Sequence, residues 1–233
     1  MKSTANDLRA LAVEITECRA CTRLVEWREQ VSAAPRASFR DETYWGRPVP
    51  GFGDAHARLL IAGLAPAAHG GNRTGRVFTG DRSGDFLFAA LHRAGYANQP
   101  TSVDRDDGLD LRDAYVTAAV RCAPPQNRPT PGERDTCRPY LVREIQCLTR
   151  VQVIVALGGF AYDAVWAALR AAGHRLPSPR PPFGHGKEVE VASGLVVVGS
   201  YHPSQQNTFT GRLTPAMLDA VFARAREVTA PAR

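Results

Sequence analysis

The apolar residues of the chain gather in four short runs that are rich in β-branched side chains. Runs of this kind predict strands buried on both faces, and they occupy residues 57–63, 114–122, 151–159 and 194–202. Helical patterns of apolar and polar positions lie between and after these runs, at 84–94, 132–149, 160–172 and 214–228. This alternation predicts an α/β fold, a three-layer α/β/α sandwich with a central four-stranded parallel sheet.

The N-terminal part of the chain has a different pattern. One helix is predicted over about 4–17, and a polar segment with aromatic residues follows to about residue 55. A chain of 233 residues can bury a full core, so we expect a single domain over 1–233, with the segment 1–55 attached to it. Charged residues interrupt the apolar stretches near the N-terminus, and no run has the length of a membrane span. We therefore expect a soluble, cytoplasmic protein with no membrane partner.

The segments that follow the predicted strands are the best candidates for a functional site. Ligands of parallel sheets bind outside the carboxyl ends of the strands, where this chain has the segments 63–81, 122–133, 157–160 and 201–212. The first segment, "GLAPAAHGGNRTGRVFTGD", is rich in glycine but lacks the lysine and the spacing of the phosphate-binding motifs. The ligand at this edge is therefore not expected to be a nucleotide phosphate.

Charge leaves the question of a polyanionic partner open. The net charge is +6, which suits a phosphate backbone. Only two of the 29 basic residues are lysines, Lys2 and Lys187. Because an arginine bias also follows from a GC-rich genome, the charge alone does not establish nucleic-acid binding.

Four of the five cysteines form two pairs that predict a metal site. Cys18 and Cys21 have the spacing C-x2-C, and Cys122 and Cys137 have the spacing C-x14-C. A disulfide framework is not expected, because cytosolic thiols stay reduced. Both zinc and a 4Fe-4S cluster accept four thiolates, and the wide spacing of the second pair favours a structural 4Fe-4S cluster that ties segment 1–55 to the sheet. Cys147 lies on an apolar helix face and is interpreted as a core residue.

Polar and aromatic residues at the strand ends are the candidates for chemistry. His202 ends the fourth strand, beside a run of amides, and the following proline keeps it extended. Asn127 lies in a loop that prolines stiffen, and the first segment offers Phe78 and the carboxylate of Asp81. The placement of His202 favours a functional over a structural role.

These motifs together resemble a known family. The segments "GLAPAAHGGNRTGRVFTGD", "YVTAAVRCAPPQNRPTPGE", "ALGG" and "SYHPSQQNTFTGRLT", with the four cysteines, are similar to the iron–sulfur branch of the uracil-DNA glycosylase superfamily. The resemblance is closer to family 5 (type B) than to family 4, and it covers about residues 18–217.

The resemblance implies a role for each motif. The enzyme would hydrolyse the N-glycosidic bond of uracil in DNA during base excision repair, with Asp81 as the catalytic carboxylate, Asn127 beside the scissile bond and His202 donating to uracil O2. The cluster would be held by Cys18, Cys21, Cys122 and Cys137. The substrate-binding residues would be Gly63, Leu64, Ala65, Phe78 and Asn207.

The family also implies how DNA is bound. Phe78 would stack on a base rotated out of the helix, and the loop carrying Gln205, Asn207 and Arg212 would enter the minor groove. The partner would be double- or single-stranded DNA with a damaged base. The protein would act as a monomer, associated with the nucleoid of a bacterium or archaeon.

Two departures from the family pattern bear on substrate range. Ala118 replaces an asparagine that pairs with uracil in strict relatives, and Ala65 and Ala67 replace an aspartate and a tyrosine of the best-known branch. A roomier pocket is expected, which accepts hypoxanthine and hydroxymethyluracil as well as uracil. Because lysine is scarce, a Schiff base is not expected, and the enzyme is predicted to be monofunctional.

Three other interpretations remain open at this point. A family 4-like enzyme would be restricted to uracil. A metal-containing nucleic-acid-binding module would have no need of Asp81 or His202. An electron-transfer protein would need an accessible redox couple.

Overall fold

The computed structural model describes residues 4–191 and 194–230, and its centre is a mixed sheet. The sheet has six strands in the order β1-β3-β2-β4-β6-β5. Their bounds are Phe52–Gly53 for β1, Leu59–Gly63 for β2, Ala114–Ala118 for β3, Val153–Leu157 for β4, Glu188–Val191 for β5 and Leu195–Ser200 for β6.

The four predicted strands are confirmed as the parallel centre of the sheet, but the predicted strand count is wrong. β3, β2, β4 and β6 pair in parallel, while β1 and β5 add antiparallel edges. β1 has only two residues, and β5 is largely solvent-exposed. Neither strand carries the apolar run by which a buried strand is predicted from sequence.

Helices surround this sheet, and the predicted ones are confirmed. The described helices are α1 (Thr4–Thr16), α2 (Thr22–Ala33), α3 (Gly71–Thr74), α4 (Arg82–Arg93), α5 (Pro131–Cys147), α6 (Gly159–Ala171), α7 (Gln205–Phe209) and α8 (Pro215–Thr229). Short 3-10 turns occupy Ala37–Phe39 and Pro125–Asn127. The helix α2 was not predicted, because its few buried apolar residues stand among charged ones.

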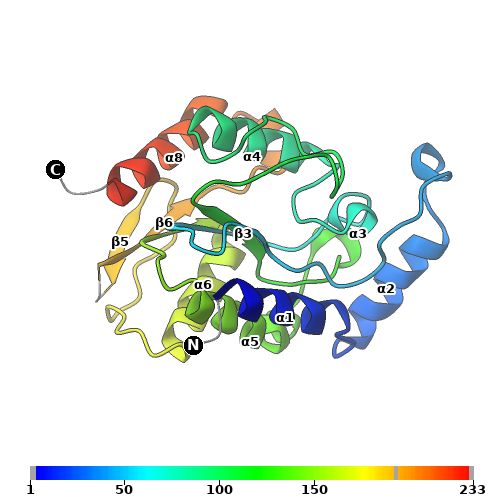
Figure 1. Cartoon of the computed structure of the whole chain (residues 1–233), viewed down its shortest axis with the longest axis horizontal. Helices are drawn as coiled ribbons and strands as arrows, with labels where there is room; N and C mark the ends of the chain where they lie inside the picture. The colour runs from blue at the N-terminus through cyan, green and yellow to red at the C-terminus, as the bar shows by residue number, and fades with distance from the viewer. Residues whose placement is uncertain (1–3, 192–193, 231–233) are drawn as a thin grey trace.

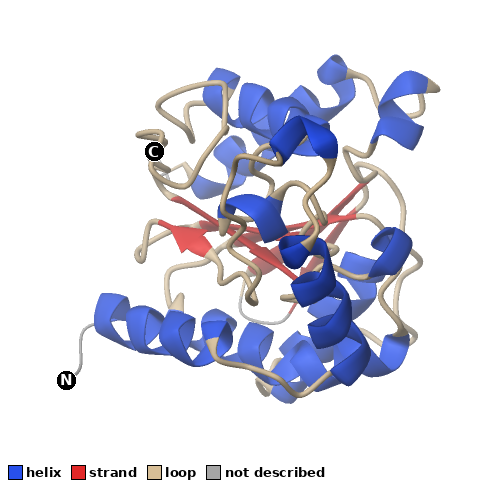
Figure 2. Cartoon of the chain, turned by 90° about the vertical axis from the view of Figure 1, so that its right-hand side faces the viewer, coloured by secondary structure: helices blue, strands red, loops and turns tan. Residues whose placement is uncertain are grey.

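The helices form a layer on each face of the sheet, as the sandwich fold requires. Helices α4 and α8 cover one face, and α5 and α6 cover the other, with α1 packed on α5 (Figure 1). In the perpendicular view the strands lie between the two helical layers (Figure 2). Among the described residues, no helix combines the length and the apolar character that crossing a bilayer requires.

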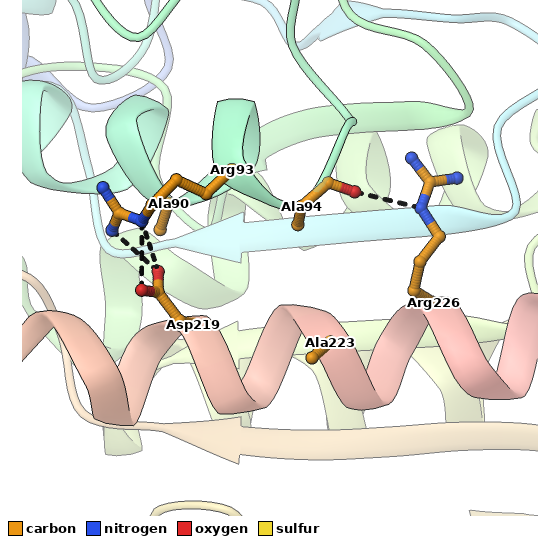
Figure 3. A pocket seen from close by; sticks show the side chains of 6 residues that line it. All are labelled: Ala90, Arg93, Ala94, Asp219, Ala223 and Arg226. Atoms are coloured by element: carbon orange, nitrogen blue, oxygen red, sulfur yellow. Dashed lines mark hydrogen bonds and ion pairs between the residues drawn. The ribbon is translucent and has the colours of Figure 1, made fainter.

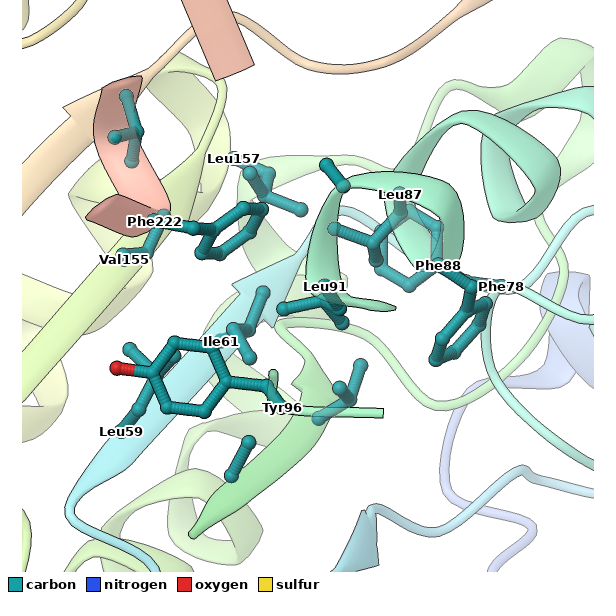
Figure 4. Close-up of a cluster of buried hydrophobic side chains, with 14 of the residues drawn as sticks. Leu59, Ile61, Phe78, Leu87, Phe88, Leu91, Tyr96, Val155, Leu157 and Phe222 are labelled. Atoms are coloured by element: carbon teal, nitrogen blue, oxygen red, sulfur yellow. The ribbon is translucent and has the colours of Figure 1, made fainter. Parts of the chain in front are cut away.

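Alternate residues of each central strand face opposite layers of the core. Leu59 and Ile61 of β2 pack with Phe222 of α8 and with α4 (Figure 4). Leu60 and Ala62 of the same strand pack against the layer of α5 and α6. This two-sided burial explains why the parallel strands are continuous apolar runs.

Side-chain caps fix where the helices begin next to the strand ends. Thr130 and Glu133 form a capping box at α5, with Pro131 in the first turn. Thr214 caps α8 and Asp81 caps α4 by accepting a backbone N–H three residues on. The loops between strand and helix are therefore held at both ends.

A buried ion pair lies where segment 1–55 meets β3. Arg121 Nη2 is 2.6 Å from Glu144 Oε2, and both side chains are 1 % exposed. The hydroxyl of Thr117 donates to the same carboxylate at 2.7 Å, and Val49 N donates to Arg121 O at 2.7 Å. The pair therefore joins β3, α5 and the N-terminal segment.

Breaking this pair on one side is expected to destabilise the fold strongly. Arg121→Met leaves the Glu144 carboxylate buried without its cation, which costs about 3–5 kcal/mol of unfolding free energy. Urea denaturation measures this loss, and the double variant Arg121→Met/Glu144→Leu recovers most of it. The exposed pair of Arg93 and Asp219 is the control, since Arg93→Met costs less than about 1 kcal/mol. Equal, small losses at both arginines would contradict the assignment.

Candidate active site

The parallel strands end at one edge of the sheet, and the predicted site residues follow them there. Gly63 of β2 lies beside Ala118 of β3, and Leu157 of β4 lies beside Ser200 of β6. The loops after β2 and β3 continue side by side, because Gly63 O and Leu64 O accept from the backbone N–H groups of the two residues after Ala118. The backbone of Gly63 and Leu64 therefore lines this edge of the sheet.

The ring of Phe78 packs against Gly63, and the backbone of Phe78 is left-handed. Its φ is 52°, and a Cβ built at residue 63 would lie 2.5 Å from the Phe78 ring. A Cβ built on Gly84 would overlap the carbonyl oxygen of Phe78. Only glycine at these two positions lets the ring and its backbone come so close.

Phe78 and His202 come from distant parts of the chain but lie next to each other. Their ring centroids are 5.8 Å apart, with an angle of 32° between the ring planes. Gly158, which follows β4, also lies against His202, since its built Cβ would be 3.3 Å from the His202 Cβ. Three of the four strand ends thus contribute to one small region.

Asp81 lies three residues after Phe78, at the start of α4. Its Oδ1 accepts from Gly84 N at 3.0 Å, and its other oxygen is packed so closely against Gly70 that a Cβ there would overlap it. Burial raises the pKa of Asp81, and the backbone N–H groups of Gly84 and Ser83 act in the opposite direction. The carboxyl group is thus held rigidly and partly shielded from water.

His202 is a neutral side chain in this environment. Burial lowers its pKa to about 4, so that near neutral pH one ring nitrogen donates and the other accepts. Asn207 Nδ2 donates to the backbone oxygen of His202 at 2.8 Å. The amide of Asn207 therefore holds the loop in place rather than projecting freely into solvent.

Asn127, the third predicted catalytic residue, lies at the end of the 3-10 turn Pro125–Asn127 that follows β3. It is exposed, and both it and Gln126 have left-handed backbones, with φ values of 56° and 55°. Its backbone N–H donates to Pro124 O at 3.2 Å. Within residues 4–191 and 194–230, its side chain makes no hydrogen bond to His202 or to the backbone of Phe78.

The three alanines that depart from the family pattern have different surroundings. Ala118 is buried in the same apolar cluster as Phe78. Ala67 is partly buried, and its carbonyl oxygen accepts from Asn72 N at 3.0 Å. Ala65 packs instead against the apolar cluster that contains Cys122. The site and the cysteines are thus neighbours.

Three of the four predicted metal ligands pack together beside this loop, and the fourth, Cys18, is close enough to affect their pKa values. Cys122 and Cys137 are buried against Leu24, and Cys21 packs on them. Burial raises the pKa of Cys122 to about 12 and that of Cys137 to about 11. Repulsion from Cys18 also raises the pKa values of the other three thiols. The described residues contain no group of three or more His, Cys, Asp or Glu side chains arranged to hold one metal ion.

Cys147 does not belong to this group. It is partly buried and packs on the cluster between the sheet and helices α5 and α6. This placement agrees with its interpretation as a core residue.

Two further residues beside the site were not predicted. Phe209, at the end of α7, is 68 % exposed, and the guanidinium of Arg82 lies 5.4 Å from its ring centroid. Asn72, in α3, is fully buried and donates to Arg28 O at 3.3 Å. Phe209 could have been found from the sequence, as an aromatic residue in a loop of amides. The link from Asn72 to α2 could not, because it depends on tertiary structure.

A hollow between α4 and α8 is not part of this site. It measures about 430 Å³ and lies at the end of α4 opposite to Asp81 (Figure 3). Arg93 pairs with Asp219 at 2.7 Å, and Arg226 Nε donates to Ala94 O at 3.1 Å across it. Its walls carry none of the predicted catalytic residues.

Comparison with known proteins shows the family to which the chain belongs. The model of the uracil DNA glycosylase superfamily matches residues 50–226. The type-5 uracil-DNA glycosylase of Mycobacterium tuberculosis is 56 % identical over 96 % of this chain and 82 % of its own length. The enzyme of the same type from Thermus thermophilus is 50 % identical over 95 % of this chain and 98 % of its own length.

Similarity to the family 4 branch is weaker. The type-4 uracil-DNA glycosylase of Archaeoglobus fulgidus is 36 % identical over 67 % of this chain and 70 % of its own length. Both the degree and the extent of identity therefore favour type 5, as the motifs indicate. The chain belongs to the uracil DNA glycosylase superfamily and, within it, to the type-5 uracil-DNA glycosylases.

Proposed function

We propose that this protein is a monofunctional DNA glycosylase that removes uracil and other deaminated or 5-substituted bases from DNA in base excision repair. The observation that carries the proposal is the pair of rings, Phe78 and His202, which lie together at the strand ends with Asp81 on the same loop. The substrate is DNA with a damaged base, double- or single-stranded. The enzyme works as a monomer in the cytoplasm, at the nucleoid.

The charges of the site suit the cleavage of an N-glycosidic bond. As the bond breaks, positive charge develops on the sugar and negative charge on the base. The Asp81 carboxylate supplies the anion for the sugar, and the neutral imidazole of His202 supplies a donor for the O2 atom of the base. Since Gly84 N–H already holds Asp81, the anion needs no reorganisation during the reaction.

The base must leave the helix to reach these groups, which costs a few kcal/mol. Stacking on the Phe78 ring offsets about 1–3 kcal/mol of that cost. In this proposal the loop that carries Gln205, Asn207 and Arg212 enters the minor groove, and Phe209, whose ring is exposed, fills the gap left by the base. Arg82, next to Asp81, keeps a cation beside that ring.

Asn127 assists near the scissile bond in this proposal. The support for this role is that Asn127 is exposed, in the turn that follows β3 at the carboxyl edge of the sheet. Asparagine tolerates the left-handed backbone that it adopts there. The side chain is thus free to take a partner from the DNA.

The alanines support a broad substrate range. Ala118 shares the apolar cluster of Phe78 and has no amide with which to select uracil. A methyl group at position 67, where relatives have a tyrosine, leaves room for a 5-substituent. We therefore include hypoxanthine and hydroxymethyluracil among the substrates.

A hydrolytic, monofunctional reaction follows from the distribution of lysine. Lys2 lies outside the described residues, and Lys187 is exposed in the turn before β5. Within residues 4–191 and 194–230, Lys187 makes no hydrogen bond or ion pair with Asp81 or His202, so no described amine is positioned to attack the sugar. Water is the proposed nucleophile.

The cysteine group suits a structural 4Fe-4S cluster held by Cys18, Cys21, Cys122 and Cys137. The support for this proposal is the donor set: Cys21, Cys122 and Cys137 pack in one cluster, and Cys18 is close enough to raise their pKa values by repulsion. Four thiolates are the usual ligands of a 4Fe-4S cluster. The bound cluster would supply a cross-link between segment 1–55 and the sheet, as part of a single domain over 1–233.

The role of Asp81 is tested with Asp81→Asn, which separates chemistry from capping. Asparagine caps a helix as well as aspartate, so the unfolding free energy is retained, while single-turnover uracil release falls about 10²–10³-fold. In the wild type the rate falls as Asp81 is protonated, at a pH above the pKa of an exposed aspartate, because burial raises this pKa. This acid limb disappears in the variant.

The matched control is Asp85→Asn, in the same helical turn but exposed. It keeps an acid limb and the wild-type rate above it, but the limb moves to lower pH, because the charge of Asp85 contributes to the raised pKa of Asp81. His202, with a pKa of about 4, stays neutral over most of the series. Wild-type rates of uracil release for Asp81→Asn would contradict the catalytic role of Asp81.

Substrate range is tested with matched duplexes that contain uracil, hypoxanthine or hydroxymethyluracil. The wild-type enzyme is expected to release all three bases, and Asp81→Asn to lose all three activities, because one site serves every substrate. An undamaged duplex is the blank. Release of uracil with no activity on hypoxanthine would restrict the enzyme to the family 4-like range.

A further inference from the structure

The environment of Cys122 contains a buried cation that the proposed chemistry does not use. Arg28 of α2 is 2 % exposed, and its Nη1 donates to the Sγ of Cys122 at 2.9 Å. The other terminal nitrogen donates to Cys18 O at 3.2 Å. One guanidinium thus contacts a thiol of one cysteine pair and the backbone of the other.

This cation is poorly compensated by ordinary ion pairing. Its nearest carboxylate oxygen is Glu29 Oε1, at 3.8 Å from Nη2. Glu29 is itself hydrogen-bonded to the exposed Arg19. Arg28 Nε is buried with no hydrogen-bond partner among the described residues. A buried charge of this kind is costly unless a negative group stabilises it.

A 4Fe-4S cluster with four thiolates carries net negative charge, which would provide that group. Hydrogen bonds and charges near the sulfur atoms set the potential and the retention of such clusters. We propose that Arg28 is a positioning residue for the cluster, which orients the Cys122 sulfur and stabilises the cluster charge. The inference rests on the proposed cofactor.

The backbone of Arg28 extends this arrangement to the loop after β2, residues 63–81, which we call the base loop. Its carbonyl oxygen accepts from Ser32 Oγ at 2.7 Å and from the buried Asn72 Nδ2 at 3.3 Å. Asn72 belongs to α3, between Gly63 and Phe78. Arg28 therefore contacts the cysteine group through its side chain and the base loop through its backbone carbonyl.

The test compares Arg28→Met with Arg19→Met in the full-length, iron-loaded protein. Arg19 lies in the same segment, and its side chain donates to Glu29 and to no thiol of the described residues. Removing the buried cation makes reduction less favourable, so the cluster potential of Arg28→Met shifts to a more negative value. Loss of iron to a chelator accelerates about 10–100-fold. Arg19→Met matches the wild type in both measurements.

Arg28→Lys keeps the charge, but lysine lacks the planar guanidinium with which Arg28 contacts both cysteine segments. The cluster potential of this variant is expected to equal that of the wild type, while iron is lost faster. If Arg28→Met does not fold, Arg28→Lys is the variant on which the test depends. Iron-loaded Arg28 variants that match Arg19→Met in potential and iron loss would overturn this inference alone. Protein isolated with zinc, or without iron, would overturn the proposed cluster as well.

Discussion

The close contact between Phe78 and the end of β2 is the constraint on which the site depends. The ring lies on Gly63, and the carbonyl of Phe78 lies on Gly84, so both positions exclude a side chain. The left-handed backbone of Phe78 costs free energy that the surrounding packing must offset. This packing brings the ring to His202 and starts α4 at Asp81, three residues later.

The sheet makes this constraint possible because it is buried on both faces. Layers of helices fix the parallel strands, and their carboxyl ends then form a rigid edge on which short loops can hold chemistry. Asp81 caps a helix, Asn207 holds the backbone of His202 and Asn72 holds that of Arg28. Each functional segment is therefore attached to the scaffold by a polar side chain of its own loop or of a neighbouring one.

Much of this organisation could be predicted from sequence, because it is local. The apolar runs predict the four parallel strands, and the position of His202 and of the glycine-rich loop after strand ends predicts where the site lies. The edge strands β1 and β5 could not be predicted, since they are short or polar and exist only by pairing. The contact of Arg28 with Cys122, 94 residues away, depends on tertiary structure. The inward role of Asn207 also depends on its fold, because the sequence shows only one amide among several.

The central claim is that the loop after β2 wraps a single extruded base. A crystal structure of Asp81→Asn bound to a uracil-containing duplex tests it most directly. The account predicts the uracil ring stacked on Phe78, its O2 within hydrogen-bond reach of His202, and the sugar beside residue 81. A uracil still stacked within the duplex, or bound away from these three residues, would contradict the account.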